Sequence, residues 1–169
     1  MGWGPGSHGS PGRVEGIVDD LAMDLPCDFL VLKDRGFDPE RILVPTAGGP
    51  DSELSAAVAR LLRDEYGSEI TLLHVAESRD DGERFLQSWA AEHDLRAATL
   101  RVETGDVEAA IERAATAHSM LILGATEQGL LSRLVRGTLV LDVVDDVECS
   151  VLLAEKTRSR GFVERLIGN

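Results

Sequence analysis

The sequence predicts an α/β fold with a doubly wound, mostly parallel five-stranded sheet and an extra N-terminal edge strand that pairs antiparallel. Three observations support this fold class. From Arg41 onward, short aliphatic runs alternate with stretches of helical periodicity, which is typical of a parallel sheet with crossover helices. Gly124 follows the fourth aliphatic run, at the end of the strand where such sheets place a ligand crevice. An internal repeat supplies a further aliphatic run before residue 40.

The first strand of the parallel set is predicted over residues 41 to 47, and a GGPD turn leads from it into a helix. We expect Asp51 or Ser52 to cap this helix and Gly67 to end it. Its apolar residues recur at helical spacing, which predicts one buried stripe formed by Leu54, Ala57, Val58, Leu61 and Leu62. The second strand is predicted over residues 69 to 77.

The rest of the chain continues this alternation. Phe85 and Trp89 share one face of the next helix, and we expect Trp89 to lie in the core. A strand over residues 98 to 105 is followed by a helix that Asp106 caps. The apolar face of that helix is formed by Val107, Ala110, Ile111, Ala114 and Ala115. The remaining elements are a strand over 119 to 125, short helices around 128 to 136 and 138 to 146, and a fifth strand over 149 to 155.

The internal repeat has an offset of 122 residues. It aligns Gly2, Val18, Asp20, Asp24, Cys27 and Leu30 with Gly124, Val140, Asp142, Asp146, Cys149 and Leu152. Chance matches among common residues are the alternative, but both copies share the order of glycine loop, helix, cysteine and aliphatic strand. The same offset aligns FLVLK (29 to 33) with VLLAE (151 to 155), and we expect these two segments to hydrogen-bond along the sheet edge.

These patterns divide the chain into three parts. Residues 1–38 are interpreted as the remnant of a preceding repeat, with a loop, a helix and a strand. Residues 39–157 form the main domain. Residues 158–169 are predicted to form an amphipathic tail helix, because four apolar residues fall on one face: Phe162, Val163, Leu166 and Ile167.

Composition excludes several classes of protein. The formal charge of -13 argues against nucleic acid as a partner. The longest aliphatic runs are far shorter than the roughly 20 residues that cross a bilayer, so we expect no direct membrane insertion of this chain. Lys33 and Lys156 are the only lysines, and this acidic, lysine-poor composition favours a halophilic source. The N-terminus lacks the pattern of a secretion signal, which favours the cytoplasm.

The segment that starts at Gly124 is the main candidate site. A strand that ends in this glycine, a loop, and Gly137-Thr138 at the start of a helix would turn backbone amides toward an anion such as a phosphate. The alternative is that Gly124 and Gly137 serve only as turn and helix-packing glycines and that Thr138 is only a helix cap.

At these residues the chain resembles the universal stress protein family, whose ATP-binding members carry G-x2-G-x9-G-[ST] after the fourth strand. Gly124 and Gly137-Thr138 match this pattern, while Glu127 stands at the middle glycine and Gly129 comes two residues later. The segments ILVPT, LLHV, LILG and CSVLL also occur in the order of the family. The first of them usually continues into an Asp that contacts the nucleoside, and this chain has Ala47 there.

The resemblance implies a nucleotide-binding α-hydrolase-like fold and a site for ATP or AMP, with Mg²⁺ only alongside ATP and no metal site of the protein's own. The implied site residues are Pro45, Thr46, Ala47, Val75, Gly124, Thr126, Gly129, Gly137 and Thr138. Ala47 and Glu127 weaken nucleoside and phosphate recognition, because a carboxylate beside a phosphate repels it. An interaction module that has lost its ligand therefore stays open as an alternative.

We expect no catalysis. The four histidines have no Ser or Cys nucleophile in a recognisable elbow, and the glycine-rich segment lacks the lysine of a P-loop. No catalytic residue is assigned, and a slow nucleotide hydrolase is the remaining alternative.

The order of a truncated repeat and then a full domain resembles the cytoplasmic end of haloarchaeal amino-acid permeases and related transporters. This resemblance implies a regulatory domain that is tethered to the membrane domain of a transporter. It also implies a homodimer, or a pseudo-dimer within one chain, formed through the Val151-Glu155 strand.

Overall fold

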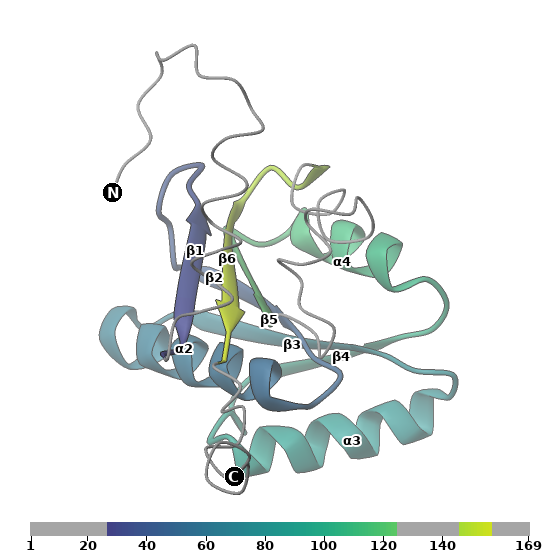
Figure 1. Cartoon of the computed structure of the whole chain (residues 1–169). Helices are drawn as coiled ribbons and strands as arrows, with labels where there is room; N and C mark the ends of the chain where they lie inside the picture. Colours follow the sequence, from purple (N-terminus) through teal and green to yellow (C-terminus); the bar gives the residue numbers. More distant parts are fainter. Residues whose placement is uncertain (1–26, 125–145, 157–169) are drawn as a thin grey trace, which may run out of the picture.

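The computed structural model describes residues 27–124 and 146–156. Within them, six strands form one sheet in the order β1-β6-β5-β2-β3-β4 (Figure 1). The strands are β1 (Phe29–Lys33), β2 (Arg41–Pro45), β3 (Glu69–Val75), β4 (Thr99–Glu103), β5 (Met120–Gly124) and β6 (Ser150–Glu155). The helices are α2 (Pro50–Tyr66), α3 (Arg79–Glu92) and α4 (Val107–Ala115). Strands β2 to β6 are parallel and β1 is antiparallel, so the predicted fold class is confirmed.

Helices cover both faces of the sheet (Figure 1). On one face, Leu86 and Trp89 of α3 pack with α2 against Ile42, which confirms Trp89 as a core residue. On the other face, Ile111 of α4 packs against Leu43. Burial from both sides explains why the central strands are continuous aliphatic runs without polar alternation.

Helix α2 buries a stripe that only partly matches the predicted one. Val58 and Leu62 pack against the core as predicted. Leu61 is 64% exposed, and the buried positions of the helix carry small side chains. These positions are Asp51, Ser52, Ser55, Ala56 and Ala59. Small residues let the helix backbone approach the sheet closely, whereas a leucine stripe would hold it farther away. Val107, which was expected on the apolar face of α4, is likewise exposed because it is the first residue of that helix.

The predicted cap of α2 is also wrong. The N-cap residue is Gly49, which has a φ of 87° and no side chain that could cap the helix. Pro50 takes the first helical position. Asp51 therefore lies inside the first turn, and its carboxylate accepts a hydrogen bond from the Lys156 amide. Two other predicted ends are confirmed, since Gly67 closes α2 in the left-handed conformation and the Asp106 side chain accepts from the Ala109 amide of α4.

The predicted pairing of β1 with β6 is confirmed. Val31 lies opposite Leu153 and Phe29 opposite Glu155 in an antiparallel ladder. The Ser150 hydroxyl fixes the loop after β1, because it accepts from the Arg35 amide at 2.9 Å and donates to the Gly36 carbonyl at 3.0 Å. Strand β1, the strand predicted for the segment interpreted as the remnant of a preceding repeat, is thus part of the sheet.

Several predicted elements lie outside the described residues. They are the helix before residue 27, the short helices within 128–136 and 138–145, and the tail helix within 158–169. In the two described ranges, no helix is both long enough and apolar enough to cross a membrane.

Candidate functional site

The candidate site lies at the carboxyl ends of β5 and β2. The chain runs from β2 to β3 on one side, while β5 lies on the other side of β2, so the strand order reverses between β5 and β2. A doubly wound sheet opens its crevice at this reversal. The β2–β5 ladder pairs Ile42 with Met120 and Leu43 with Leu121, and it ends there, before either strand ends.

Thr46 is the first residue after β2. This residue is buried, its amide donates to the Leu73 carbonyl at 2.8 Å, and its hydroxyl accepts from the Gly48 amide at 3.1 Å. Its carbonyl accepts from Nδ1 of His74 at 2.8 Å, so this ring nitrogen carries the proton. The hydroxyl and both backbone groups of Thr46 thus hold the turn in place. Pro45 is half-buried and Ala47 is exposed, so Ala47 brings no polar group to the crevice.

Gly124 contacts the first turn of α2. A Cβ atom at this position would lie 2.7 Å from the Asp51 carbonyl carbon and 2.8 Å from the Ser52 nitrogen. Both atoms belong to the backbone, which moves far less readily than the end of a side chain. The residue must therefore be glycine for α2 to pack against β5, which gives Gly124 the helix-packing role that the sequence left open.

Two carboxylates and one lysine occupy the mouth of the site. Asp51, 8% exposed, accepts from the Lys156 amide at 2.9 Å, and the Glu53 carboxylate pairs with Nζ of Lys156 at 2.8 Å. The hydrogen bond and charge of Lys156 lower the pKa of Glu53, and Glu53 raises the pKa of Lys156. These contacts join the end of β6 to the start of α2 and place negative charge where the helix dipole is positive.

Val75 ends β3 on the opposite side of the site. It is half-buried and lies opposite Glu103 in the β3–β4 ladder. The neighbouring His74 ring stacks on Phe85, with 4.3 Å between ring centroids, and a Cβ on Gly48 would lie 3.7 Å from Phe85. The His74 and Phe85 rings therefore lie beside the turn that follows β2.

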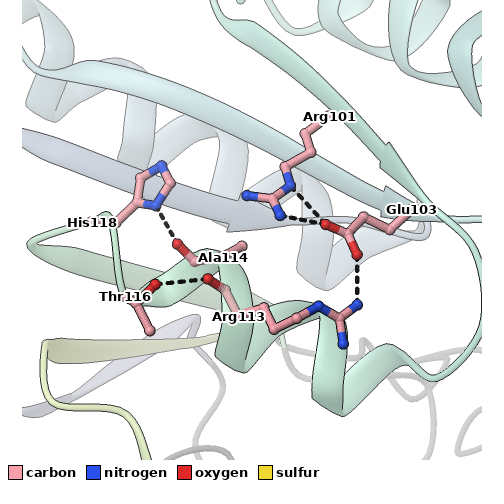
Figure 2. Close-up of polar contacts among 6 residues, drawn as sticks. All are labelled: Arg101, Glu103, Arg113, Ala114, Thr116 and His118. Carbon is pink, nitrogen blue, oxygen red and sulfur yellow. Dashed lines mark hydrogen bonds and ion pairs between the residues drawn. The ribbon is translucent and has the colours of Figure 1, made fainter.

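A second polar cluster lies at the end of β4. Figure 2 shows Glu103 between two arginines, Arg101 of the same strand and Arg113 of α4. Arg101 Nε lies 2.8 Å and Arg113 Nη2 lies 2.6 Å from the Glu103 carboxylate, whose side chain is 18% exposed. Hydrogen bonds from Arg113 and Arg101 lower the pKa of Glu103. The cluster ties α4 to the sheet.

The structure brings together only part of the predicted site. Pro45 and Gly124 lie at the carboxyl ends of β2 and β5, which are neighbouring parallel strands, Thr46 and Ala47 follow directly after β2, and Val75 ends β3. The other predicted site residues, Thr126, Gly129, Gly137 and Thr138, lie outside the described residues, as does Glu127.

Sequence reasoning missed the lysine at the mouth and both polar clusters. Their members lie up to 105 residues apart in the chain, and periodicity does not reveal such pairs. The one available signal was that Lys156 is one of only two lysines and follows the fifth parallel strand directly.

The described half of the site does not fit a triphosphate. Asp51 and Glu53 would repel phosphate oxygens, and the Lys156 ammonium is already paired with Glu53. Among residues 27–124 and 146–156, no three His, Cys, Asp or Glu side chains are grouped as a metal ion would require.

No protein-family model matches the chain, and no curated protein matches it by sequence. Solved structures match its fold. A universal stress protein in complex with cAMP superposes with a TM-score of 0.55 at 16% identity, over 68% of this chain and 94% of that one. The chain has the universal stress protein fold.

Two longer structures share this fold. A universal stress protein from Archaeoglobus fulgidus DSM 4304 superposes with a TM-score of 0.54 at 16% identity, over 72% of this chain and 45% of that one. The cytoplasmic domain of a prokaryotic cation chloride cotransporter gives a TM-score of 0.58 at 14% identity, over 89% of this chain and 60% of that one. The chain thus spans about half of each of these two structures.

Replacing Gly124 tests the packing of α2. We expect Gly124→Ala to lower the free energy of unfolding by about 1–3 kcal/mol, because the new methyl group overlaps backbone atoms. It should also shift the amide NMR signals of Ser52 and Lys156. Gly36→Ala is the control, since it adds a methyl group in open space and carries only the strain of a positive φ. A Gly124→Ala protein with unchanged stability and unchanged signals at both amides would contradict this assignment.

The arginine pair on Glu103 predicts an acid-dependent contribution to stability. The folded-state pKa is below the unfolded one, so the carboxylate stabilises the fold above the unfolded pKa of about 4.3 and loses this effect as pH falls through the folded pKa. In urea titrations, Glu103→Gln should be less stable than the native chain at pH 7, and the difference should shrink below pH 4. Glu83→Gln, at an exposed carboxylate of α3, controls for net charge. A difference that is constant from pH 7 to pH 3 would refute the ion-pair account.

Proposed function

We propose that this chain is a non-catalytic regulatory domain of a membrane transporter of the amino-acid permease type, and that it works through association between domains. The fold likeness to the cytoplasmic domain of a cotransporter supports this proposal, because it extends over 89% of the chain. In this proposal the domain lies in the cytoplasm and is tethered to the membrane through the rest of the protein.

The observation that carries the proposal is the β1–β6 pairing. In the resembled family, the edge of the last strand pairs antiparallel between subunits. Here β1 takes that place within one chain, with five residue pairs from Phe29↔Glu155 to Lys33↔Val151. A protein that builds a subunit-like contact into its own sheet fits a role in holding domains together. Binding of a partner at the strand ends would favour one arrangement of such domains over another.

The polar groups of the described site support a structural role over a catalytic one. His74 donates to a backbone carbonyl, Glu103 is held by two arginines, and Lys156 is paired with Glu53. Each of these groups already has a partner that fixes its position, whereas a catalytic base or nucleophile must meet a substrate.

A nucleotide sensor for ATP or AMP is the second candidate. Two observations favour it: the glycines that match the family pattern, and a structural neighbour that is in complex with cAMP. The carboxylates Asp51 and Glu53 and the exposed Ala47 favour the first candidate, in which the ligand site has been lost.

Titration calorimetry separates the two candidates. We expect no saturable heat with ATP, AMP or cAMP at millimolar concentration, in low and in molar salt, because carboxylates at the mouth repel phosphates. Ala47→Asp restores the carboxylate of the resembled family and serves as the comparison variant. Saturable binding by the native chain would establish the sensor, and phosphate release faster than that of a Gly137→Val variant would establish the hydrolase.

The transporter assignment predicts the context of the gene. We expect hydrophobic spans of about 20 residues in the reading frame that encodes this chain, and we expect the product to sediment with membranes. An antibody to residues 39–157 detects the product in cell fractions. A product found only in the soluble fraction, with no such spans, would refute the assignment.

A further inference from the structure

Strand β1 has the composition of an interior strand but lies at the edge of the sheet that the described strands form. Its middle residues are apolar on both faces, with Leu30 and Leu32 on one face and Val31 on the other. They are 48%, 44% and 36% exposed, respectively. Strands that are apolar on both faces normally lie inside a parallel sheet with helices above and below. An edge strand exposed to water normally carries charges instead.

Strand β6 shows the environment that suits this composition. At the repeat offset of 122 residues, Leu30 corresponds to Leu152 and Leu32 to Ala154. Ala154 is fully buried, and Leu152 packs against the core on one face. Strand β6 has a neighbour on each edge, β5 in parallel and β1 antiparallel, whereas β1 has a neighbour on one edge only among the described strands. The two strands share a sequence pattern, but neighbouring elements bury much more of β6 than of β1.

The register relates the two strands by a local two-fold axis. Val31, the middle residue of β1, lies opposite Leu153, which is its own counterpart in the repeat. Leu30 lies opposite Ala154 and Leu32 opposite Leu152, so the axis exchanges these two pairs. A two-fold axis perpendicular to the sheet, midway between Val31 and Leu153, therefore maps β1 onto β6, and it maps β5 onto the open edge of β1.

We infer that the open edge of β1 binds a parallel aliphatic strand from a second α/β lobe, which lies N-terminal to the repeat in the same polypeptide. The two-fold axis requires a counterpart of β5 beside β1, and that lobe's helices would cover the exposed faces of Leu30, Val31 and Leu32. The repeat aligns Gly2 with Gly124, the last residue of β5, which places the partner strand before the rest of the repeat in the chain. The cotransporter domain, of which this chain matches 60%, is long enough to hold a further lobe.

A second copy of this chain fits the edge less well. Its own β5 is already paired on both sides, so it cannot supply the strand that the axis requires. The charge of -13 on each copy also opposes association. A lobe of the same polypeptide is held at high effective concentration and avoids this cost.

Hydrogen exchange of two polypeptides tests the inference. One is the 169-residue chain, and the other is the product of the natural reading frame from its own start codon. In the 169-residue chain, amides of β1 that face β6 should be protected, while the alternate amides exchange quickly. In the longer product both sets should be protected. Fast exchange of the alternate amides in that product, or a reading frame that starts at Met1, would overturn the inference. Protection of both sets in the 169-residue chain would also overturn it, because residues 1–26 or a second copy would then fill the edge.

Two substitutions give an independent measurement. Leu30→Lys and Leu32→Lys should lower the Tm of the longer product by about 4 °C or more, because each charge would be buried under the second lobe. In the 169-residue chain they should have little effect, since both side chains are nearly half exposed. Leu61→Lys on α2 is the matched control and should be tolerated in both polypeptides. Equal effects of the β1 substitutions in the two polypeptides would refute the inference.

This inference goes beyond the proposed transporter function and fails separately from it. A longer product with a second lobe but no hydrophobic spans would refute the transporter assignment alone. A product with hydrophobic spans and an unprotected β1 edge would refute the second lobe alone.

Discussion

The close contact between Gly124 and the first turn of α2 determines the geometry of the site. Because Gly124 has no side chain, the backbone of Asp51 and Ser52 can lie directly against the end of β5. The small residues of α2 continue this approach along the helix. The contact also places the Asp51 carboxylate where it meets the Lys156 amide, so the packing of one helix sets both the shape and the charge of the crevice.

The charges divide the carboxyl edge of the sheet into two regions. Near β5 and β6, Asp51 and Glu53 share one lysine, which leaves the region negative. Near β4, Glu103 is paired with both Arg101 and Arg113, while Asp106 and Glu108 follow the strand. An anion would be repelled from the start of α2.

The strands could be predicted from sequence because buried parallel strands are aliphatic throughout, as Ile42, Leu43 and Val44 illustrate. The antiparallel pairing of β1 could be predicted because the repeat identified its partner. The stripe of α2 was predicted only in part. Val58 and Leu62 pack against the core, but Leu61 is exposed, because the close approach to Gly124 selects serine and alanine at the buried positions. The Lys156–Asp51 contact depends on tertiary structure, which brings together residues 105 positions apart.

The pairing of Phe29 with Glu155 means that the chain enters β1 and leaves β6 at adjacent points. Tension between the two flanks of the chain would therefore load the ladder from one end and peel its hydrogen bonds one after another. Strands pulled from opposite ends share the load among all their bonds and resist far greater force. Peeling would start at Phe29 and Glu155, while Ser150 secures the far end of β1 through the Arg35 and Gly36 backbone. The β1–β6 ladder would thus separate under a weak force, one hydrogen bond at a time.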